Sequence, residues 1–399
     1  MHILGLLKGY FMKIGIITLY HNSYNYGGIL QAFALCRILQ RNGVQPEQIS
    51  YEHIINTSFK ERIGRLFENG IFSAIKKIFA YLKKDKNISV NLQEQNIRKN
   101  AFYKFSQILI SHSNEVYNQY SISECIDKYD VFITGSDQVW NYVGYDTAYF
   151  LDFVDGTKKK KFSYAASFSM KELTDEQKTI VANSLRDYTA ISVREKDAVE
   201  LLDGLTDKPV AYVVDPTLLL QQEEWDEVCA ERVVEEKYVF GYFLGTNIDV
   251  VRIAKEFAYQ RNFKFVMIPF ASGRYNMNED RLADIRIVDA SPEKFLSLIR
   301  HAEYVFTDSF HAVVFSFIYK KQFFVFNRDK KGTMNSRIFN ITELFGVKER
   351  FCDSKDKESL VYVEGLEDID YMGSFEKFEE LKAKSVEFLN GIVSNEKNS

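Results

Sequence analysis

Short apolar runs alternate along this chain with stretches in which apolar residues recur every three or four positions. The first pattern is typical of buried parallel strands, and the second of helices that cover a sheet. One series of predicted strands lies at residues 13–18, 131–134, 161–165, 190–193 and 210–214. A second series lies at residues 238–243, 263–268, 285–288, 304–307 and 323–326. The alternation predicts an α/β protein with two Rossmann-like domains.

The two series are separated at about residues 216–236 by Pro216 and a polar stretch. We therefore expect an N-terminal domain at residues 12–220 and a C-terminal domain at residues 221–375. The stretch 375–394 is charged and amphipathic, which predicts a C-terminal helix that closes the chain.

A basic insertion at about residues 58–106 interrupts the first domain. Between residues 58 and 100, ten Lys or Arg face four Asp or Glu, a local net charge of +6. Within residues 71–84, isoleucines and a phenylalanine fall on one helical face and lysines flank them. Two interpretations stay open. The segment is either a surface helix packed on the domain or a helix in peripheral contact with an anionic membrane.

Composition and charge exclude several classes of protein. The 399 residues are 46% hydrophobic and 27% charged, which argues against disorder and permits large cores. The net charge of −4 makes nucleic acid a poor expectation as a partner. The four cysteines show no metal-ligand spacing, which predicts a reducing compartment and no metal site. The first eleven residues lead directly into a predicted strand, so Met12 is an alternative start to Met1 and no signal peptide is expected.

Two polar segments at the ends of predicted strands suit a sugar or an anion. Gly27 and Gly28 lie between a strand and a helix, where glycines allow a ligand to approach the backbone closely. A plain tight turn explains these glycines equally well. Residues 135–141 follow another strand and offer the polar groups of Asp137 and its neighbours beside the face of Trp140.

Three charged residues suit acid catalysis or anion binding. Arg194 ends a predicted strand, where a guanidinium can bind a carboxylate or phosphate through two hydrogen bonds, unless it forms a surface salt bridge. His311 falls in the first turn of a helix that Asp308 or Ser309 can cap, so its imidazole suits general acid catalysis. Arg337 opens a later helix and is a second candidate for anion binding.

Six short motifs occur in order between about residues 13 and 347, and together they resemble the polysaccharide pyruvyl transferase family. They lie at residues 25–31, 135–141, 164–168, 192–195, 214–217 and 307–311. The resemblance implies two Rossmann-like domains in a GT-B-like arrangement with a cleft between them. It also implies that the enolpyruvyl group of phosphoenolpyruvate is transferred to two hydroxyls of a hexose, commonly as a galactose 4,6-ketal. Phosphoenolpyruvate is a donor substrate, and no metal or organic cofactor is expected, because an acid, two cationic groups and a carboxylate are sufficient for this chemistry.

The resemblance also implies roles for individual residues. Arg194 matches the family's arginine for donor binding, and His311 matches its essential histidine. Ser309 stands where many members carry an arginine, and we expect Arg337 to supply that second cationic contact. We expect Asp137 to orient or deprotonate the acceptor hydroxyl. The expected acceptor contacts are Asn25, Gly27, Gly28, Gln31, Gln138, Trp140 and Asn141.

Two other functions remain open on the sequence. A GT-B glycosyltransferase that uses a nucleotide sugar fits the same two-domain organisation. A non-catalytic glycan-binding protein fits the serine at position 309. For the transferase, we expect the acceptor to be a lipid-linked oligosaccharide precursor of a capsule or exopolysaccharide. The protein would meet it in the cytoplasm at the inner face of the cell membrane, through residues 71–84.

Overall fold

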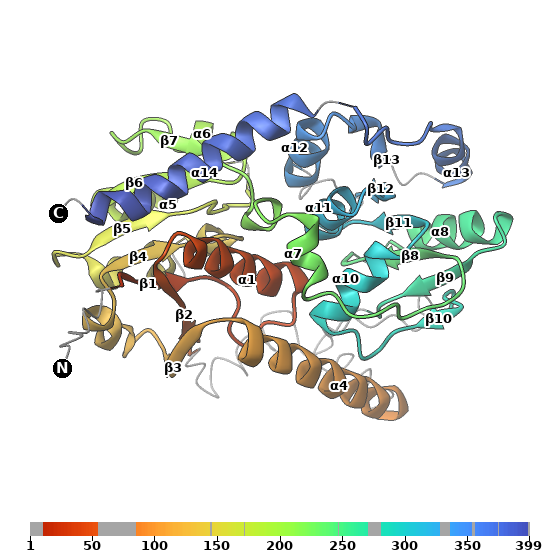
Figure 1. Ribbon diagram of the computed structural model, residues 1–399, viewed down its shortest axis with the longest axis horizontal. Helices are drawn as coiled ribbons and strands as arrows, with labels where there is room; N and C mark the ends of the chain where they lie inside the picture. Colours follow the sequence, from red (N-terminus) through yellow and green to blue (C-terminus); the bar gives the residue numbers. More distant parts are fainter. Residues whose placement is uncertain are drawn as a thin grey trace, which may run out of the picture.

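The computed structural model describes residues 11–54, 85–143, 146–170, 172–245, 247–269, 281–327, 336–352, 356–373 and 375–397. These residues form two parallel sheets with helices packed around them (Figure 1). The predicted α/β class with two Rossmann-like domains is confirmed. The predicted helix at residues 71–84 lies outside the described residues.

The first sheet has seven parallel strands in the order β3-β2-β1-β4-β5-β6-β7. The strands are β1 Lys13–Ile17, β2 Gln45–Tyr51, β3 His112–Tyr117, β4 Val131–Thr134, β5 Lys160–Ser163, β6 Tyr188–Val193 and β7 Val210–Tyr212. The strand order reverses between β1 and β4, and open α/β sheets bind ligands at the carboxyl ends of strands at such a point. The loops after β1 and β4 are therefore the expected ligand-binding region of the first sheet.

The second sheet has six strands in the order β10-β9-β8-β11-β12-β13, and its order reverses between β8 and β11. The strands are β8 Tyr238–Tyr242, β9 Lys264–Met267, β10 Ile285–Arg286, β11 Tyr304–Thr307, β12 Gln322–Phe326 and β13 Phe351–Cys352. The first sheet ends at Tyr212 and the second begins at Tyr238, so the expected boundary falls between the two sheets.

The helices cover both sheets and connect the two halves (Figure 1). The α-helices are α1 Tyr26–Arg41, α4 Asp85–Leu109, α5 Asp175–Leu185, α6 Lys196–Leu201, α7 Gln222–Asp226, α8 Ile248–Gln260, α10 Pro292–Arg300, α11 Phe310–Ile318, α12 Ser336–Leu344, α13 Asp356–Gly365 and α14 Glu376–Lys397. The 3-10 helices are η1 Ile122–Lys128, η2 Val139–Tyr142, η3 Thr147–Phe150, η4 Asp152–Val154, η5 Pro216–Leu218 and η6 Lys348–Arg350. Among the described helices, none is both long enough and apolar enough to span a membrane.

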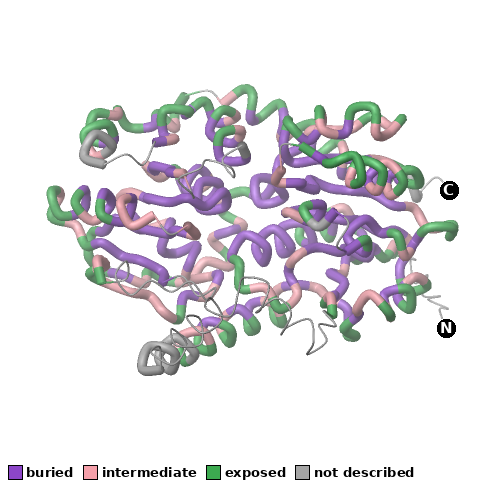
Figure 2. Tube along the Cα trace, turned by 180° about the vertical axis from the view of Figure 1, so that it is seen from behind, coloured by how far each residue is buried: buried purple, intermediate pink, exposed green. Residues whose placement is uncertain are grey.

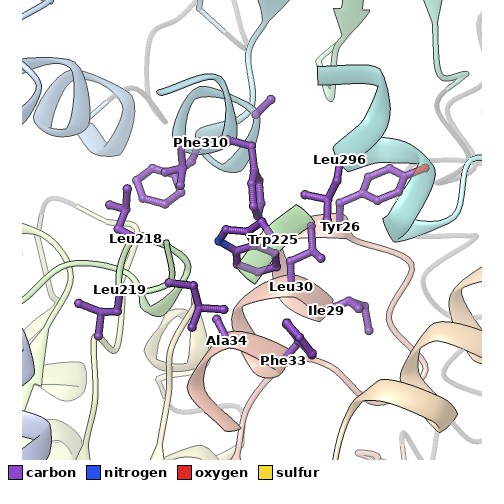
Figure 3. Packing of buried hydrophobic residues seen from close by; sticks show 14 of the residues in the cluster. Tyr26, Ile29, Leu30, Phe33, Ala34, Leu218, Leu219, Trp225, Leu296 and Phe310 are labelled. Carbon is purple, nitrogen blue, oxygen red and sulfur yellow. The ribbon is translucent and has the colours of Figure 1, made fainter. Parts of the chain in front are cut away.

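One hydrophobic cluster continues from the first half into the second, and Figure 2 shows buried segments through the middle of the molecule. Helix α1 supplies Leu30 and Phe33 to this core, where they face Trp225 of α7 (Figure 3). Phe310 of α11 and Leu296 of α10 approach the same cluster from the second half (Figure 3). Apolar packing of this kind fixes the start of α1 relative to the start of α11.

Two long helices tie the halves together at the edges of this core. Arg98 of α4 donates from Nη2 to the hydroxyl of Tyr26 at 2.9 Å and from Nη1 to the carbonyl of Pro269 at 2.5 Å. Helix α14 is the predicted closing helix, and it returns across the first half (Figure 1). Its Ser385 Oγ accepts a hydrogen bond from the backbone N–H of Val214 at 2.9 Å. The segment that follows β7 is therefore held from the second half.

Candidate active site

The loops after β1 and β4 meet the start of α11 at the junction of the two halves. A Cβ atom added at Gly27 would lie 1.9 Å from Nδ1 of His311, so the imidazole occupies the space that a side chain would fill. A Cβ added at Gly28 would lie 3.6 Å from Oδ2 of Asp137. The structure thus brings together the predicted residues Gly27, Gly28, Asp137 and His311, and position 27 requires a glycine.

The backbone of Asp137 is bent to present its carboxylate. Asp137 has a φ of 68°, a conformation that costs a non-glycine residue about 1–3 kcal/mol and that concentrates at functional sites. Its carbonyl accepts a hydrogen bond from the backbone N–H of Ser167 at 2.9 Å, which anchors the turn on the loop after β5. The carboxylate is buried and lies 3.5 Å from Nη2 of Arg194.

Arg194 lies among three buried carboxylates. Its Nη1 is 2.8 Å from Asp215, and its Nη2 and Nε are each 3.5 Å from Asp137 and Glu195 respectively. The guanidinium also lies 4.6 Å from the centre of the Phe310 ring. Burial acts to lower the pKa of Arg194, but the three carboxylates raise it, so the side chain stays charged. The alternative of a surface salt bridge is wrong because these partners are buried.

Asp215 belongs to the motif at residues 214–217, and it is a residue of this site for which the sequence alone predicted no role. It does accept from the backbone N–H of Thr217 at 3.0 Å, but it also accepts from Ser136 Oγ at 2.9 Å and pairs with Arg194. Nε2 of His311 lies 3.6 Å from its Oδ2. Burial acts to raise the pKa of Asp215, yet His311, Arg194 and Thr217 together hold it well below the usual range. The carboxyl group is therefore an anion.

Arg337 and Gln138, predicted for the donor and acceptor sites respectively, meet across the two halves. With its amide oxygen turned toward the guanidinium, Gln138 accepts from Nη1 of Arg337 at 2.5 Å and from Nη2 at 3.0 Å. Arg337 and Arg194 also line one small cavity together with Asp215 and Phe310. Its volume of about 10 Å³ is room for about one water molecule, so a larger ligand requires its walls to move.

The start of α11 is arranged differently from the expectation. Ser309 is the N-cap residue, but its side chain makes no capping hydrogen bond. Asp308 does not cap the helix, because its carboxylate accepts from the backbone N–H groups of Leu244 at 2.6 Å and Gly245 at 2.7 Å. Asp308 therefore ties the loop after β8 to the start of α11, and it holds His311 in place indirectly.

Three of the predicted acceptor contacts have structural roles instead. Trp140 is fully buried and stacks on Phe150 with ring centres 5.4 Å apart, so the prediction that its face meets a sugar is wrong in this structure. Gln31 is also buried, and it donates to Thr18 Oγ1 at 3.0 Å. Asn25 accepts from the backbone N–H of Gly27 at 3.0 Å and caps α1. Asn141 remains exposed.

A family model for polysaccharide pyruvyl transferase matches residues 25–330, which contain nearly all of the residues described above. The chain belongs to the polysaccharide pyruvyl transferase family. Of the predicted site residues, Arg337 alone lies beyond the matched range. Membership of the pyruvyl transferase family makes the protein a transferase of polysaccharide biosynthesis. A comparison with curated proteins gave no match.

Solved structures similar to this pyruvyl transferase family member share its fold. The UDP-GlcNAc 2-epimerase from Methanocaldococcus jannaschii is 13% identical, with a TM-score of 0.56 over 96% of this chain and 100% of that chain. UGT89C1 from Arabidopsis thaliana is 10% identical, with a TM-score of 0.51 over 97% of this chain and 99% of that chain. At such identities the likeness shows the fold alone, and it confirms the predicted GT-B arrangement.

Proposed function

We propose that this protein transfers the enolpyruvyl group of phosphoenolpyruvate to two hydroxyls of a galactose-type hexose and forms a 4,6-ketal. The observation that carries the proposal is the position of His311, which reaches from the second half onto Gly27 of the first. Arg194 and Arg337 line a cavity that they share with Asp215, the carboxylate beside this histidine. An acid next to two guanidinium groups suits a donor that is anionic and must be protonated.

The chemistry needs an acid and a group that accepts protons from hydroxyls. Protonated His311 gives its proton to C3 of the donor, and the first acceptor hydroxyl bonds to C2. Asp137 orients this hydroxyl and receives its proton. The bond between C2 and the phosphate oxygen then breaks, phosphate leaves, and the second hydroxyl closes the ketal ring and loses its proton to the leaving phosphate. Holding both hydroxyls in one orientation contributes much of the acceleration.

Donor binding falls to the two arginines in this proposal. Arg194 is charged and buried, and within the described part of the chain its Nε–H has no hydrogen-bond partner. Arg337 meets Gln138, an amide that can exchange a guanidinium for a sugar hydroxyl. The donor carboxylate and phosphate would bind these two guanidinium groups when the small cavity opens. Ser309, buried beside His311, can donate a further hydrogen bond to the donor.

For the acceptor, we propose a lipid-linked oligosaccharide. The support is the +6 charge of residues 58–100, which favours anionic lipid headgroups over a zwitterionic surface. We expect the protein to float with vesicles that contain anionic lipid. We expect no flotation with vesicles made of zwitterionic lipid alone. Binding that does not weaken with added salt would contradict an electrostatic contact.

The function is tested by measuring phosphate release from phosphoenolpyruvate with a lipid-linked galactoside, followed by the mass of the product. H311A should lower turnover by about 10²-fold or more, since it removes the proposed acid. His301 lies at the end of α10, where it contacts Ser297, so H301A is a matched control that should keep turnover. Undiminished turnover in H311A would contradict the mechanism. Thermal stabilisation by a nucleotide sugar in place of phosphoenolpyruvate would favour the glycosyltransferase.

A further inference from the structure

We propose that Asp215 is the positioning residue for His311: its carboxylate binds the Nε2 side of the imidazole, so that Nδ1 delivers the proton to the donor. This inference rests on the proposed function, because it assigns the acid's proton to one nitrogen of the ring. The carboxylate of Asp215 lies where the catalytic candidates of both halves meet.

Asp215 is held rigidly enough to act as a fixed anion. Its Oδ1 accepts from both the backbone N–H of Thr217 at 3.0 Å and its Oγ1 at 2.7 Å. The preceding residue, Val214, is held through its carbonyl by the hydroxyl of Tyr164 at 3.0 Å and through its N–H by Ser385 at 2.9 Å. With Oδ1 occupied and the backbone fixed, Oδ2 is the oxygen that faces the site.

Oδ2 gathers groups from different motifs. Ser136 of the loop after β4 donates to it at 2.9 Å, and Arg194 at the end of β6 donates at 2.8 Å. Nε2 of His311 in α11 lies 3.6 Å from the same atom. That distance suits an ion pair and is slightly too long for a hydrogen bond. A small shift of the ring would complete the bond when the donor binds.

The two ring nitrogens of His311 have different neighbours. Nε2 is buried and makes no hydrogen bond to any residue that the structure describes, so Asp215 is the acceptor in its reach. Nδ1 is the other ring nitrogen, and it lies against the backbone of Gly27, where the imidazole fills the space that a side chain would occupy. A carboxylate that holds one nitrogen of an imidazole fixes the tautomer and leaves the other nitrogen for proton transfer.

The proton transfers balance while Asp215 stays an anion throughout the reaction. The imidazolium of His311 loses its Nδ1 proton to C3 of the donor and keeps its Nε2 proton toward Oδ2. Three other charged residues line the cavity that Asp215 borders, namely Arg194, Glu195 and Arg337, and Asp137 lies beside Arg194. Asp215 itself has an oxygen 3.6 Å from Nε2 of His311, which is ion-pair distance.

The test compares D215N with D308N, since both remove a buried carboxylate close to His311. Asp308 accepts hydrogen bonds from the backbone N–H groups of Leu244 and Gly245, so D308N controls for the stability that is lost with a buried carboxylate. We expect D215N to lower kcat for phosphate release by on the order of 10²-fold or more. Its alkaline limb in the pH–rate profile should move to lower pH by about one unit, because a negative charge beside the imidazolium is lost. D308N should leave that limb in place.

A second measurement does not depend on turnover. In protein labelled with ¹⁵N-histidine and assigned with H311Q, the neutral ring of His311 should carry its proton on Nε2 in the wild type and in D308N. In D215N, we expect the proton to move toward Nδ1. A wild-type ring protonated on Nδ1, or an alkaline limb unmoved in D215N, would overturn the proposal. An Nε2 proton in a protein without phosphoenolpyruvate turnover would instead refute the proposed function alone.

Discussion

The two halves of the molecule contribute to the site in different ways. In the first half, Arg194 is surrounded by carboxylates that belong to the same half, at 2.8 to 3.5 Å. In the second half, His311 and Arg337 make the contacts described here with residues of the other half. The first half thus carries a preformed ionic cluster. The second half adds an acid and a guanidinium when the two halves meet.

Among the charged groups of the site, this difference assigns folding stability mainly to the ionic cluster of the first half and catalytic geometry mainly to the contacts between the halves. Charges that are compensated inside one half are costly to disturb, because a buried ion without its partner is strongly unfavourable. The polar contacts that His311 and Arg337 make between the halves set the geometry of the reacting groups instead. Substitutions in the two sets should therefore affect unfolding and turnover in different proportions.

The largest expected effect on stability is that of R194M. This change leaves Asp137, Glu195 and Asp215 buried without their shared cation, and we expect a loss of about 3–5 kcal/mol in the free energy of unfolding. R337M should cost less stability and instead raise the KM for phosphoenolpyruvate. Urea unfolding and steady-state kinetics on both variants measure the contrast. Equal losses in the free energy of unfolding would show that a guanidinium paired within one half and a guanidinium in contact with the other half contribute equally to stability.

The next effect is that of G27A on turnover. A Cβ at this position would lie 1.9 Å from Nδ1 of His311, so the imidazole must move. A displacement of the acid by about 1 Å can cost about 10²-fold in rate, and we expect a loss of at least that size. Gly391 of α14 has nothing within 4 Å of its added Cβ, so G391A is the matched control and should leave kcat unchanged. Full activity in G27A would show that the contact is not maintained during catalysis.

Much of the fold and part of the site could be predicted from the sequence. Strands β1, β4 and β11 are short apolar runs, and the residues that follow them were correctly expected at strand ends. Strands β2 and β3 were missed because they begin with polar residues, Gln45 and His112, and lack a continuous apolar run. Strand β2 pairs with β1 and strand β3 pairs with β2, and this pairing decides that they are strands.

The missed parts of the site have a common physical reason. The local sequence around Asp215 shows only a turn, whereas its cationic partner Arg194 lies 21 residues earlier and His311 is in the other half. Likewise, polar neighbours suggested an exposed Trp140, but the 3-10 helix η2 turns its ring into the core against Phe150. Contacts that depend on how separate segments pack cannot be derived from spacing along one segment.

The smallest expected effect distinguishes a hydrogen bond between the halves from one within a half. The hydroxyl of Tyr26 donates to the carbonyl of Ala290 at 2.7 Å and accepts from Arg98, whereas that of Tyr188 donates to Phe150 at 2.9 Å inside the first half. Y26F and Y188F should each lose about 1–3 kcal/mol of stability, since each leaves a buried partner unsatisfied. Only Y26F should also lower kcat, because Tyr26 precedes Gly27 and holds it against the second half. Equal turnover in the two variants, measured by phosphate release, would mean that contacts between the halves do not set the position of His311.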